Sequence, residues 1–125
     1  MKILKKSLAL FLVVALAASA FCLEAFASTR TKYGTYNGRN WGTKLAIGSF
    51  SVSGSIGYDG TSKDSVKVKW GIEYHDTYGD QYLAGTDIGT KTAKFSQAPG
   101  GRIDSASARY YIGTYCVNRY DYVTP

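Results

Sequence analysis

The segment Ser65–His75 alternates apolar and polar side chains more regularly than any other part of the chain. Its apolar positions are Val66, Val68, Trp70, Ile72 and Tyr74, and its other positions include Ser65, Lys67, Lys69, Gly71 and Glu73. Successive side chains of a β-strand point to opposite sides of the sheet, so this pattern predicts a strand with one apolar face and one face in water. Because the apolar face needs a cover, the segment also predicts a second layer of structure.

A second alternating segment, Ser49–Tyr58, comes before this strand. Its apolar side chains are Phe50, Val52, Ile56 and Tyr58. The polar residues Asp59–Asp64 separate the two segments and have the composition of a turn, so we expect the two strands to pair as an antiparallel hairpin. Leu45 and Ile47 have the opposite parity to Phe50, which predicts a bend or bulge at Gly48 where one strand becomes two.

The remaining sequence predicts further short strands and no helix of ten or more residues. Gly85 and Gly89 are expected to separate two of these strands, Asp76–Asp80 is expected to form a turn, and Gln97–Gly101 is the strongest break. The further candidates are Thr31–Tyr36 closed by Asn37-Gly38, Gln81–Ala84, Thr90–Ser96, and Ser105–Val117 followed by a tyrosine-rich tail, Tyr115–Tyr122. Six to eight short strands predict an all-β protein, a small antiparallel β-sandwich or a partly open barrel.

The first 27 residues have the pattern of a secretory signal peptide. Three lysines precede an uncharged apolar run from Ser7 to Leu23, and Ala25-Phe26-Ala27 places small residues where signal peptidase reads them. The apolar run is slightly shorter than the roughly 20 residues that an uncleaved membrane anchor needs. We therefore expect cleavage before Ser28, a single secreted, extracellular β-domain over residues 28–125, and no transmembrane segment after processing.

The charge of the processed chain favours contact with anionic surfaces. Twelve Lys and Arg remain against eight Asp and Glu, a net charge of +4, and the positive residues form no run. Scattered charge argues against a dedicated nucleic-acid site and is compatible with attraction to an anionic cell envelope. Only Cys116 remains after residue 27, so no intramolecular disulfide can form, and this thiol is either buried or pairs between chains.

Few residues could carry catalysis or hold a metal. His75 is the only histidine, which excludes a two-histidine zinc site. Three other sites are possible, but a structural role is favoured for the residues of each. They are a nucleophile and base formed by Cys116 and His75, a calcium site formed by Asp59 with Asp64 or by Asp76 with Asp80, and a carboxylate pair that includes Glu73. We therefore predict no enzyme activity, no metal and no cofactor.

Aromatic residues are the enrichment that most favours a binding function. Tyr and Trp rings with polar tips offer contact area at low entropic cost, although tyrosine is also a common strand residue. They cluster before the first alternating segment and at the end of the chain. The candidate ligand-binding residues are Tyr33, Tyr36, Trp41, Tyr110, Tyr111, Tyr115, Tyr120 and Tyr122.

A basic, Gly- and Tyr-rich secreted chain of this size, with segments such as Gly34-Thr35-Tyr36-Asn37-Gly38 and Ser107-Ala108-Arg109-Tyr110-Tyr111, broadly resembles the lactococcin 972 type of bacteriocin. That resemblance implies a small β-sandwich toxin, and it assigns no functional residue here.

The function we expect is a non-enzymatic binding module that uses aromatic and basic residues at a cell surface. Its ligand would be an envelope polymer, a carbohydrate or another anionic surface. The alternatives are a bacteriocin-like antimicrobial protein and a small carboxylate-dependent hydrolase.

Overall fold

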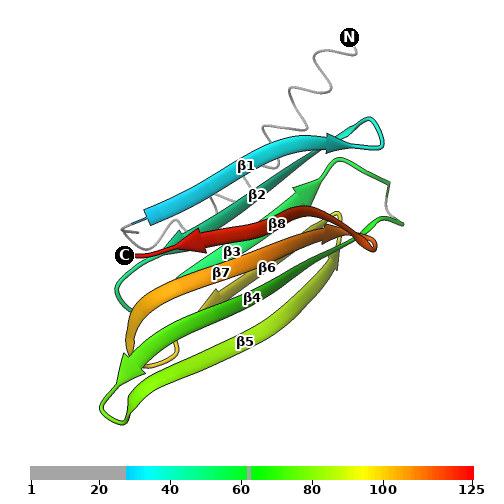
Figure 1. The fold of residues 1–125 in the computed structure, drawn as a ribbon. Helices are drawn as coiled ribbons and strands as arrows, with labels where there is room; N and C mark the ends of the chain where they lie inside the picture. The colour runs from blue at the N-terminus through cyan, green and yellow to red at the C-terminus, as the bar shows by residue number, and fades with distance from the viewer. Residues whose placement is uncertain (1–27, 62) are drawn as a thin grey trace.

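The computed structural model describes residues 28–61 and 63–125, which fold as two antiparallel four-stranded sheets packed face to face (Figure 1). The predicted signal peptide lies outside the described residues. The strands are β1 (Ser28–Tyr36), β2 (Arg39–Ile47), β3 (Val52–Tyr58), β4 (Ser65–Asp76), β5 (Gly79–Thr90), β6 (Thr92–Gln97), β7 (Arg102–Ile112) and β8 (Tyr115–Val123). The described chain is all-β, and the predicted β-sandwich is confirmed.

The first sheet has the order β1-β2-β3-β6 and the second has the order β5-β4-β7-β8. The apolar core lies between the sheets and receives alternate side chains from their strands. Its largest fully buried members include Tyr110, Leu45, Ile47, Ile56, Ile72 and Ile103. Trp70 of β4 and Phe95 of β6 stack across the core, with ring centroids 5.0 Å apart. The alternation predicted for Ser65–His75 is confirmed, because Val66, Val68, Trp70 and Ile72 are buried.

The predicted hairpin between Ser49–Tyr58 and Ser65–His75 is wrong. β3 pairs with β2 and β6, whereas β4 pairs with β5 and β7, so the segment after Tyr58 crosses from one sheet to the other. The backbone N–H of Tyr58 donates to the Lys91 carbonyl at 2.7 Å, and the N–H of Lys91 donates to the Asp64 carbonyl at 3.0 Å. The β3–β4 connection is therefore hydrogen-bonded to the β5–β6 connection, which also runs from one sheet to the other.

The prediction that Gly85 and Gly89 interrupt a strand is also wrong. β5 runs unbroken from Gly79 to Thr90, and the chain turns instead at Lys91, whose φ is 64°. Gly85 lies opposite Trp70 in the β4–β5 register, and a Cβ at Gly85 would overlap the Trp70 indole. Here a glycine leaves room for a ring on the neighbouring strand and does not end the strand.

The same arrangement recurs in the first sheet. Gly34 lies opposite Trp41, and Gly54 lies opposite Phe95; in both pairs the ring fills the space that a Cβ would need. Aromatic rings that cover glycines on the adjacent strand restore the contacts that the missing side chain would have made. These pairs give one physical reason why the chain is rich in both glycine and aromatic residues.

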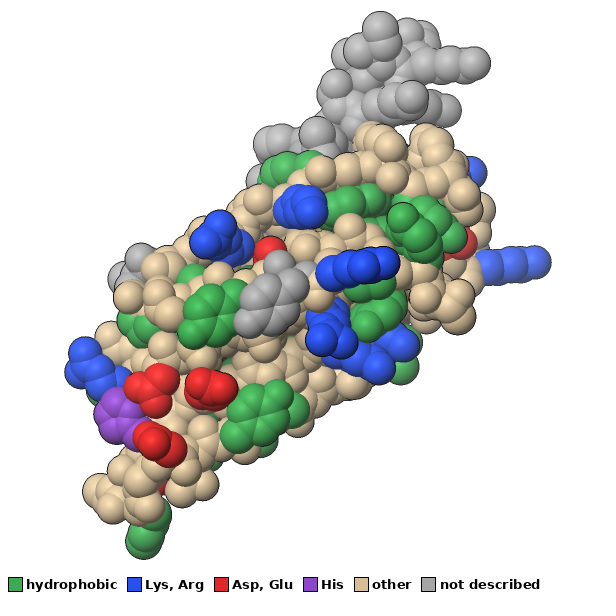
Figure 2. Space-filling model, viewed as in Figure 1, with side chains coloured by type: hydrophobic (Ala, Val, Ile, Leu, Met, Phe, Trp, Pro, Cys, Tyr) green, Lys and Arg blue, Asp and Glu red, His purple; other side chains and the backbone are tan. Residues whose placement is uncertain are grey.

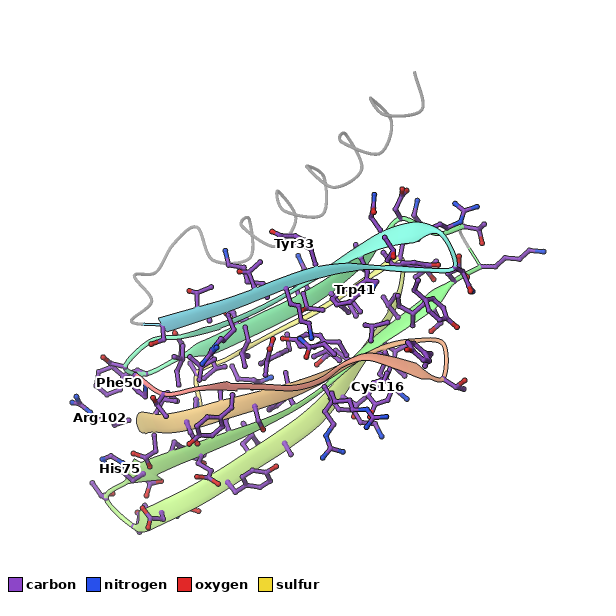
Figure 3. All side chains as sticks on the ribbon, turned by 45° about the horizontal axis from the view of Figure 1, so that its top comes forward. Tyr33, Trp41, Phe50, His75, Arg102 and Cys116 are labelled. Carbon is purple, nitrogen blue, oxygen red and sulfur yellow. The ribbon has the colours of Figure 1, made fainter. Side chains whose placement is uncertain are left out.

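Several turn predictions are confirmed at the level of the backbone. Asn37 and Gly38 join β1 to β2 with φ values of 51° and 73°, as a two-residue hairpin turn requires. The bend at Gly48 is confirmed too, because β2 ends at Ile47 and the Gly48 N–H donates to the Ser51 carbonyl at 2.8 Å. Phe50 is not on the apolar side of β3: it lies in this bend, is 63% exposed, and projects at one end of the sandwich (Figure 3).

The predicted strand Ser105–Val117 is two strands. It contains the end of β7 and the beginning of β8, which are joined by a turn at Gly113, where φ is 59°. The tyrosine-rich tail is therefore strand β8, at the edge of the second sheet.

Candidate functional site

The structure places two of the eight predicted binding residues in the core. Trp41 is 5% exposed and Tyr110 is fully buried, with its hydroxyl donating to the Lys44 carbonyl at 3.2 Å. In the folded protein neither ring is available to a ligand at the surface. Both belong to the strand pattern of alternate inward side chains, the structural role that the sequence analysis weighed against binding.

The other predicted rings do not converge on one surface. Tyr33 lies on the outer side of the first sheet (Figure 3), whereas Tyr111 and Tyr122 lie on the outer side of the second sheet. Tyr36 and Tyr115 stack on each other where β1 and β8 approach, with centroids 4.8 Å apart and planes 13° apart. The side chain of Tyr120 is outside the description. The predicted set therefore divides among several places. Tyr33 shares the outer side of the first sheet with Lys44 and Lys94, whereas one sheet face brings two of the predicted rings together with Lys67, Lys69 and Arg109.

That face is the outer side of the second sheet, the side seen in Figure 2. Residues paired across neighbouring strands point to the same side, so the register defines its membership. Acidic side chains and the histidine gather at one end of the face, and Lys and Arg side chains gather further along it. On β4 the outward positions are Lys67, Lys69, Gly71, Glu73 and His75, and their β7 neighbours include Tyr111, Arg109, Ser107, Ser105 and Arg102.

At the basic end, Lys69 lies directly opposite Arg109. The Lys67 and Lys69 ammonium nitrogens are 4.7 and 5.6 Å from the centroid of the Tyr111 ring, within the range of cation–π attraction. Among the described residues, no carboxylate forms an ion pair with Lys67, Lys69 or Arg109. This part of the face therefore presents three cations and a ring with no negative charge to balance them.

Next to these cations the face is hollowed over Gly71. The hollow has a volume of about 210 Å³, and its lining includes Lys69, Gly71, Tyr82, Ser107 and Arg109; we call it the Gly71 hollow. Tyr82 is 66% exposed, and its hydroxyl occupies the place that a Cβ on Gly71 would need. Sequence reasoning missed Tyr82 as a binding residue; the available signal was Gly71, a position without a side chain on the polar side of a strongly alternating strand.

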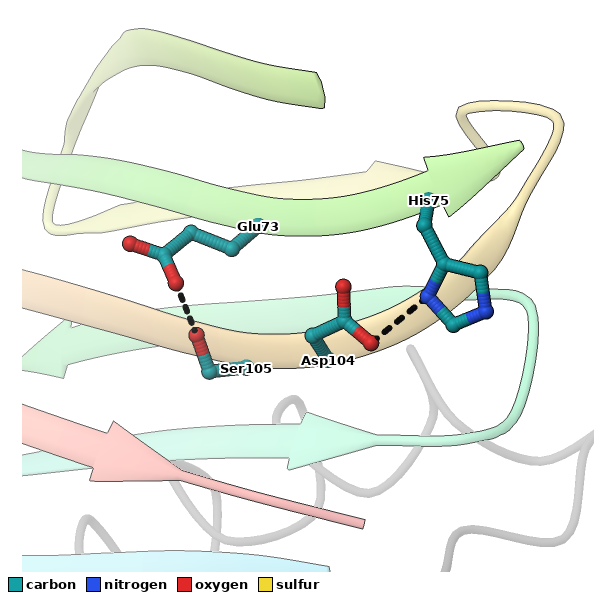
Figure 4. Close-up of polar contacts among 4 residues, drawn as sticks. All are labelled: Glu73, His75, Asp104 and Ser105. Carbon is teal, nitrogen blue, oxygen red and sulfur yellow. Dashed lines mark hydrogen bonds and ion pairs between the residues drawn. The ribbon is translucent and has the colours of Figure 1, made fainter. Parts of the chain in front are cut away.

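At the acidic end, a β-bulge brings two polar pairs together (Figure 4). His75 Nδ1 and Asp104 Oδ1 are 2.7 Å apart, and the Ser105 hydroxyl donates to Glu73 Oε2 at 3.2 Å. The carboxylate of Asp104 orients the imidazole. The Ser105 hydroxyl is engaged by Glu73 instead of His75, so these contacts do not assemble the nucleophile-to-base hydrogen bond of a serine hydrolase. The sequence analysis did not predict the His75–Asp104 pair, because the two residues come from β4 and β7 and meet only where the register between these strands shifts.

Cys116 and His75 lie toward opposite ends of the sandwich (Figure 3). Cys116 pairs with Tyr111, which pairs with Lys67. His75 lies eight residues further along β4 than Lys67, a distance of roughly 26 Å at about 3.3 Å per residue. The two side chains therefore cannot act as a nucleophile and its base. The Cys116 thiol is free and partly exposed.

A buried polar group lies behind the basic end, between the sheets. Asp121 of β8 is 8% exposed, and its Oδ2 has no hydrogen-bond partner among the described residues. Burial raises the pKa of Asp121, while hydrogen bonding with the Asn118 and Tyr110 side chains acts in the opposite direction. Burial, followed by the nearby Asp121 charge, raises the pKa of Tyr110 well above its ordinary value. Asp121 was not predicted from the sequence, because an aspartate in a tyrosine-rich segment has the composition of an exposed position.

Residues 28–61 and 63–125 were also compared with what a metal site and a membrane-spanning helix require. No group of three or more His, Cys, Asp or Glu side chains is placed to hold a metal ion. In the same residues, no helix has the length and apolar character required to span a membrane. Comparison of the chain with protein-family models, with curated proteins and with solved structures found no match.

Proposed function

We propose that this chain is a secreted, non-enzymatic module that binds a polymer of the cell surface through the outer face of the β5-β4-β7-β8 sheet. The observation that carries the proposal is the uncompensated Lys69–Arg109 pair beside the exposed ring of Tyr82 and the half-buried ring of Tyr111. Cations and rings side by side suit a ligand that offers negative charge together with apolar surface.

The electrostatic repulsion between Lys69 and Arg109 also favours binding of an anion beside this pair. Like charges directly opposite each other on neighbouring strands destabilise a sheet, by an amount comparable to the roughly 0.2–1 kcal/mol that favourable pairs contribute. The Lys69–Arg109 pair carries this cost in the free protein. A bound anion would reverse the sign of the interaction, because both cations would then face a negative group.

The shape of the site supports a polymer over a free small molecule. Pockets that enclose small ligands usually have volumes of about 300–1,000 Å³. The Gly71 hollow is smaller, and it opens onto a wide sheet face. A shallow site of this kind gains affinity when several units of one chain bind along the same face.

The test is retention of the purified protein on isolated cell walls and on their polysaccharides at low salt. The variant K69Q/R109Q should lose at least about tenfold in affinity, since hydrogen bonds to charged groups contribute about 1.5–3 kcal/mol each. The matched control is K63Q/K94Q, which has the same net charge and alters Lys63 in the β3–β4 connection and Lys94 on the first sheet. Equal retention of the two variants would contradict the proposal.

The bacteriocin-like alternative makes a different prediction for the same sample. Growth of bacteria whose walls retain the protein should then stop at concentrations that saturate binding. A binding module alone should coat the cells and leave their growth unchanged.

A further inference from the structure

We infer that the Gly71 hollow receives one carboxylate-bearing sugar unit of the bound polymer, with the sugar ring against Tyr82 and the carboxylate between Lys69 and Arg109. This inference rests on the proposed function and adds the chemical class of the ligand. It predicts preference for polymers of acidic sugars over neutral polymers of the same backbone.

The cations define the charged half of the ligand. Lys69 and Arg109 are direct cross-strand neighbours, so their side chains rise from the sheet next to each other on one side of the hollow. The guanidinium of arginine donates two parallel hydrogen bonds to a carboxylate, and lysine adds a compact positive charge. Tyr111 lies within cation–π distance of Lys69 at 5.6 Å and of Lys67 at 4.7 Å, which favours ammonium positions over this part of the sheet.

The other wall defines the uncharged half. Tyr82 belongs to β5 and reaches over Gly71, so one ring lines the hollow from the side opposite β7. The face of a tyrosine ring packs against flat, weakly polar surface, and the C–H face of a pyranose is such a surface. Ser107 is the register partner of Gly71 and adds a hydroxyl that can donate to or accept from a sugar hydroxyl.

The cations and the tyrosine ring line one small hollow, so a ligand that contacts both must carry its negative charge and its ring in the same unit. A uronic acid places its carboxylate on the sugar ring itself, so one unit satisfies both halves. A polyphosphate chain offers charge with no ring, and a neutral glycan offers a ring with no charge. A carboxylated polysaccharide is therefore the polymer that matches all the lining side chains.

The ligand experiment uses calorimetry of the purified protein with polygalacturonate, with the same polymer after methyl esterification, and with polyphosphate, all at one low ionic strength. The inference predicts that the acid form binds at least about tenfold more tightly than the ester, since the ester cannot accept the charge-assisted bonds. Polyphosphate should bind more weakly than polygalacturonate at equal charge concentration.

The protein experiment uses three variants of the hollow. Gly71→Ala keeps every charge but adds a methyl group where the Tyr82 hydroxyl lies, and Tyr82→Ala removes the ring. Arg109→Gln removes the paired cation. Each should weaken polygalacturonate binding about tenfold or more. Tyr78→Ala is the matched control, because Tyr78 is 89% exposed in the β4–β5 turn and does not line the hollow.

The outcomes separate this inference from the proposed function. If the ester or polyphosphate binds as tightly as the acid polymer, or if Gly71→Ala and Tyr82→Ala bind like the control, the inference is overturned while wall binding stands. If anionic lipid vesicles compete fully with polygalacturonate, charge alone selects the ligand and the inference is again overturned. If the purified protein is also not retained on isolated cell walls, both this inference and the proposed function are overturned.

Discussion

At the scale of single residues, Asp121 is the group whose environment departs most from what its chemistry prefers. A carboxylate with one unpartnered, buried oxygen costs about 1–3 kcal/mol or more in lost solvation. Arg30 and Lys32 on β1 lower its pKa electrostatically, but burial outweighs them and the net shift is upward. The folded protein therefore holds a proton on Asp121 at pH values where the unfolded chain releases it.

This shift predicts how stability depends on pH. Because the folded pKa of Asp121 is raised, its contribution to the free energy of unfolding is undiminished below the unfolded pKa of about 3.9, falls as pH rises toward the folded pKa, and stays low above it. Asp121→Asn removes the titration. We expect the variant to melt above the parent protein at pH 7, by roughly 4–8 °C per kcal/mol gained, with a smaller difference at pH 3. Thermal unfolding followed by circular dichroism measures both values, and a difference that grows toward pH 3 would contradict this assignment.

At the scale of elements, individual strands could be predicted from the sequence better than their partners. The alternation of Ser65–His75 is a local property and was readable directly, as was the Asn37-Gly38 turn. Pairing is not local. β3 and β4 are joined by a polar segment of hairpin length, but each strand finds its neighbours elsewhere, because both are central strands that pair on two sides.

The structural roles of the glycines also could not be predicted from neighbouring residues in the sequence alone. Gly85 looked like a break because glycine weakens an isolated strand. Its actual role depends on Trp70, which lies fifteen residues earlier in the chain and directly opposite in the sheet. Such a role becomes visible only when the register is known.

The pairing of glycine with an aromatic ring makes a testable prediction for Gly54. A Cβ at this position would overlap the Phe95 ring, so Gly54→Ala should destabilise the protein by about 1–3 kcal/mol, the usual cost of overpacking. In a Phe95→Leu background the same substitution should cost clearly less, because the ring is gone. Denaturant unfolding of the four proteins of this double-mutant cycle measures the coupling. Equal costs in the two backgrounds would show that the ring does not occupy the space above Gly54.

At the scale of the whole molecule, the sandwich has one core and two unlike outer faces. The composition indicated aromatic and basic residues as the binding groups, and the structure leaves Tyr111 and Tyr122 on the face that also carries Lys69 and Arg109. The sequence did not distinguish the buried rings of Trp41 and Tyr110 from the rings on the outer faces, because which side of a strand faces the core depends on how the sheets pack. Register shifts between β7 and β8 change that parity again within the tyrosine-rich tail.

Secretion, cleavage before Ser28 and the resemblance to the lactococcin 972 type stay predictions of the sequence. The proposed binding of a cell-surface polymer concerns one part of the fold. It depends on the outer face of the second sheet, which brings together residues from β4, β5 and β7 that are far apart in the chain.

The most direct measurement is the backbone amide NMR spectrum of the protein titrated with soluble cell-wall polysaccharide. We expect the largest chemical-shift changes at residues of the Gly71 hollow, and we expect them to saturate together; these residues are Lys69, Gly71, Tyr82, Ser107 and Arg109. Changes confined to the outer side of the first sheet, around Tyr33 and Lys94, would contradict this prediction.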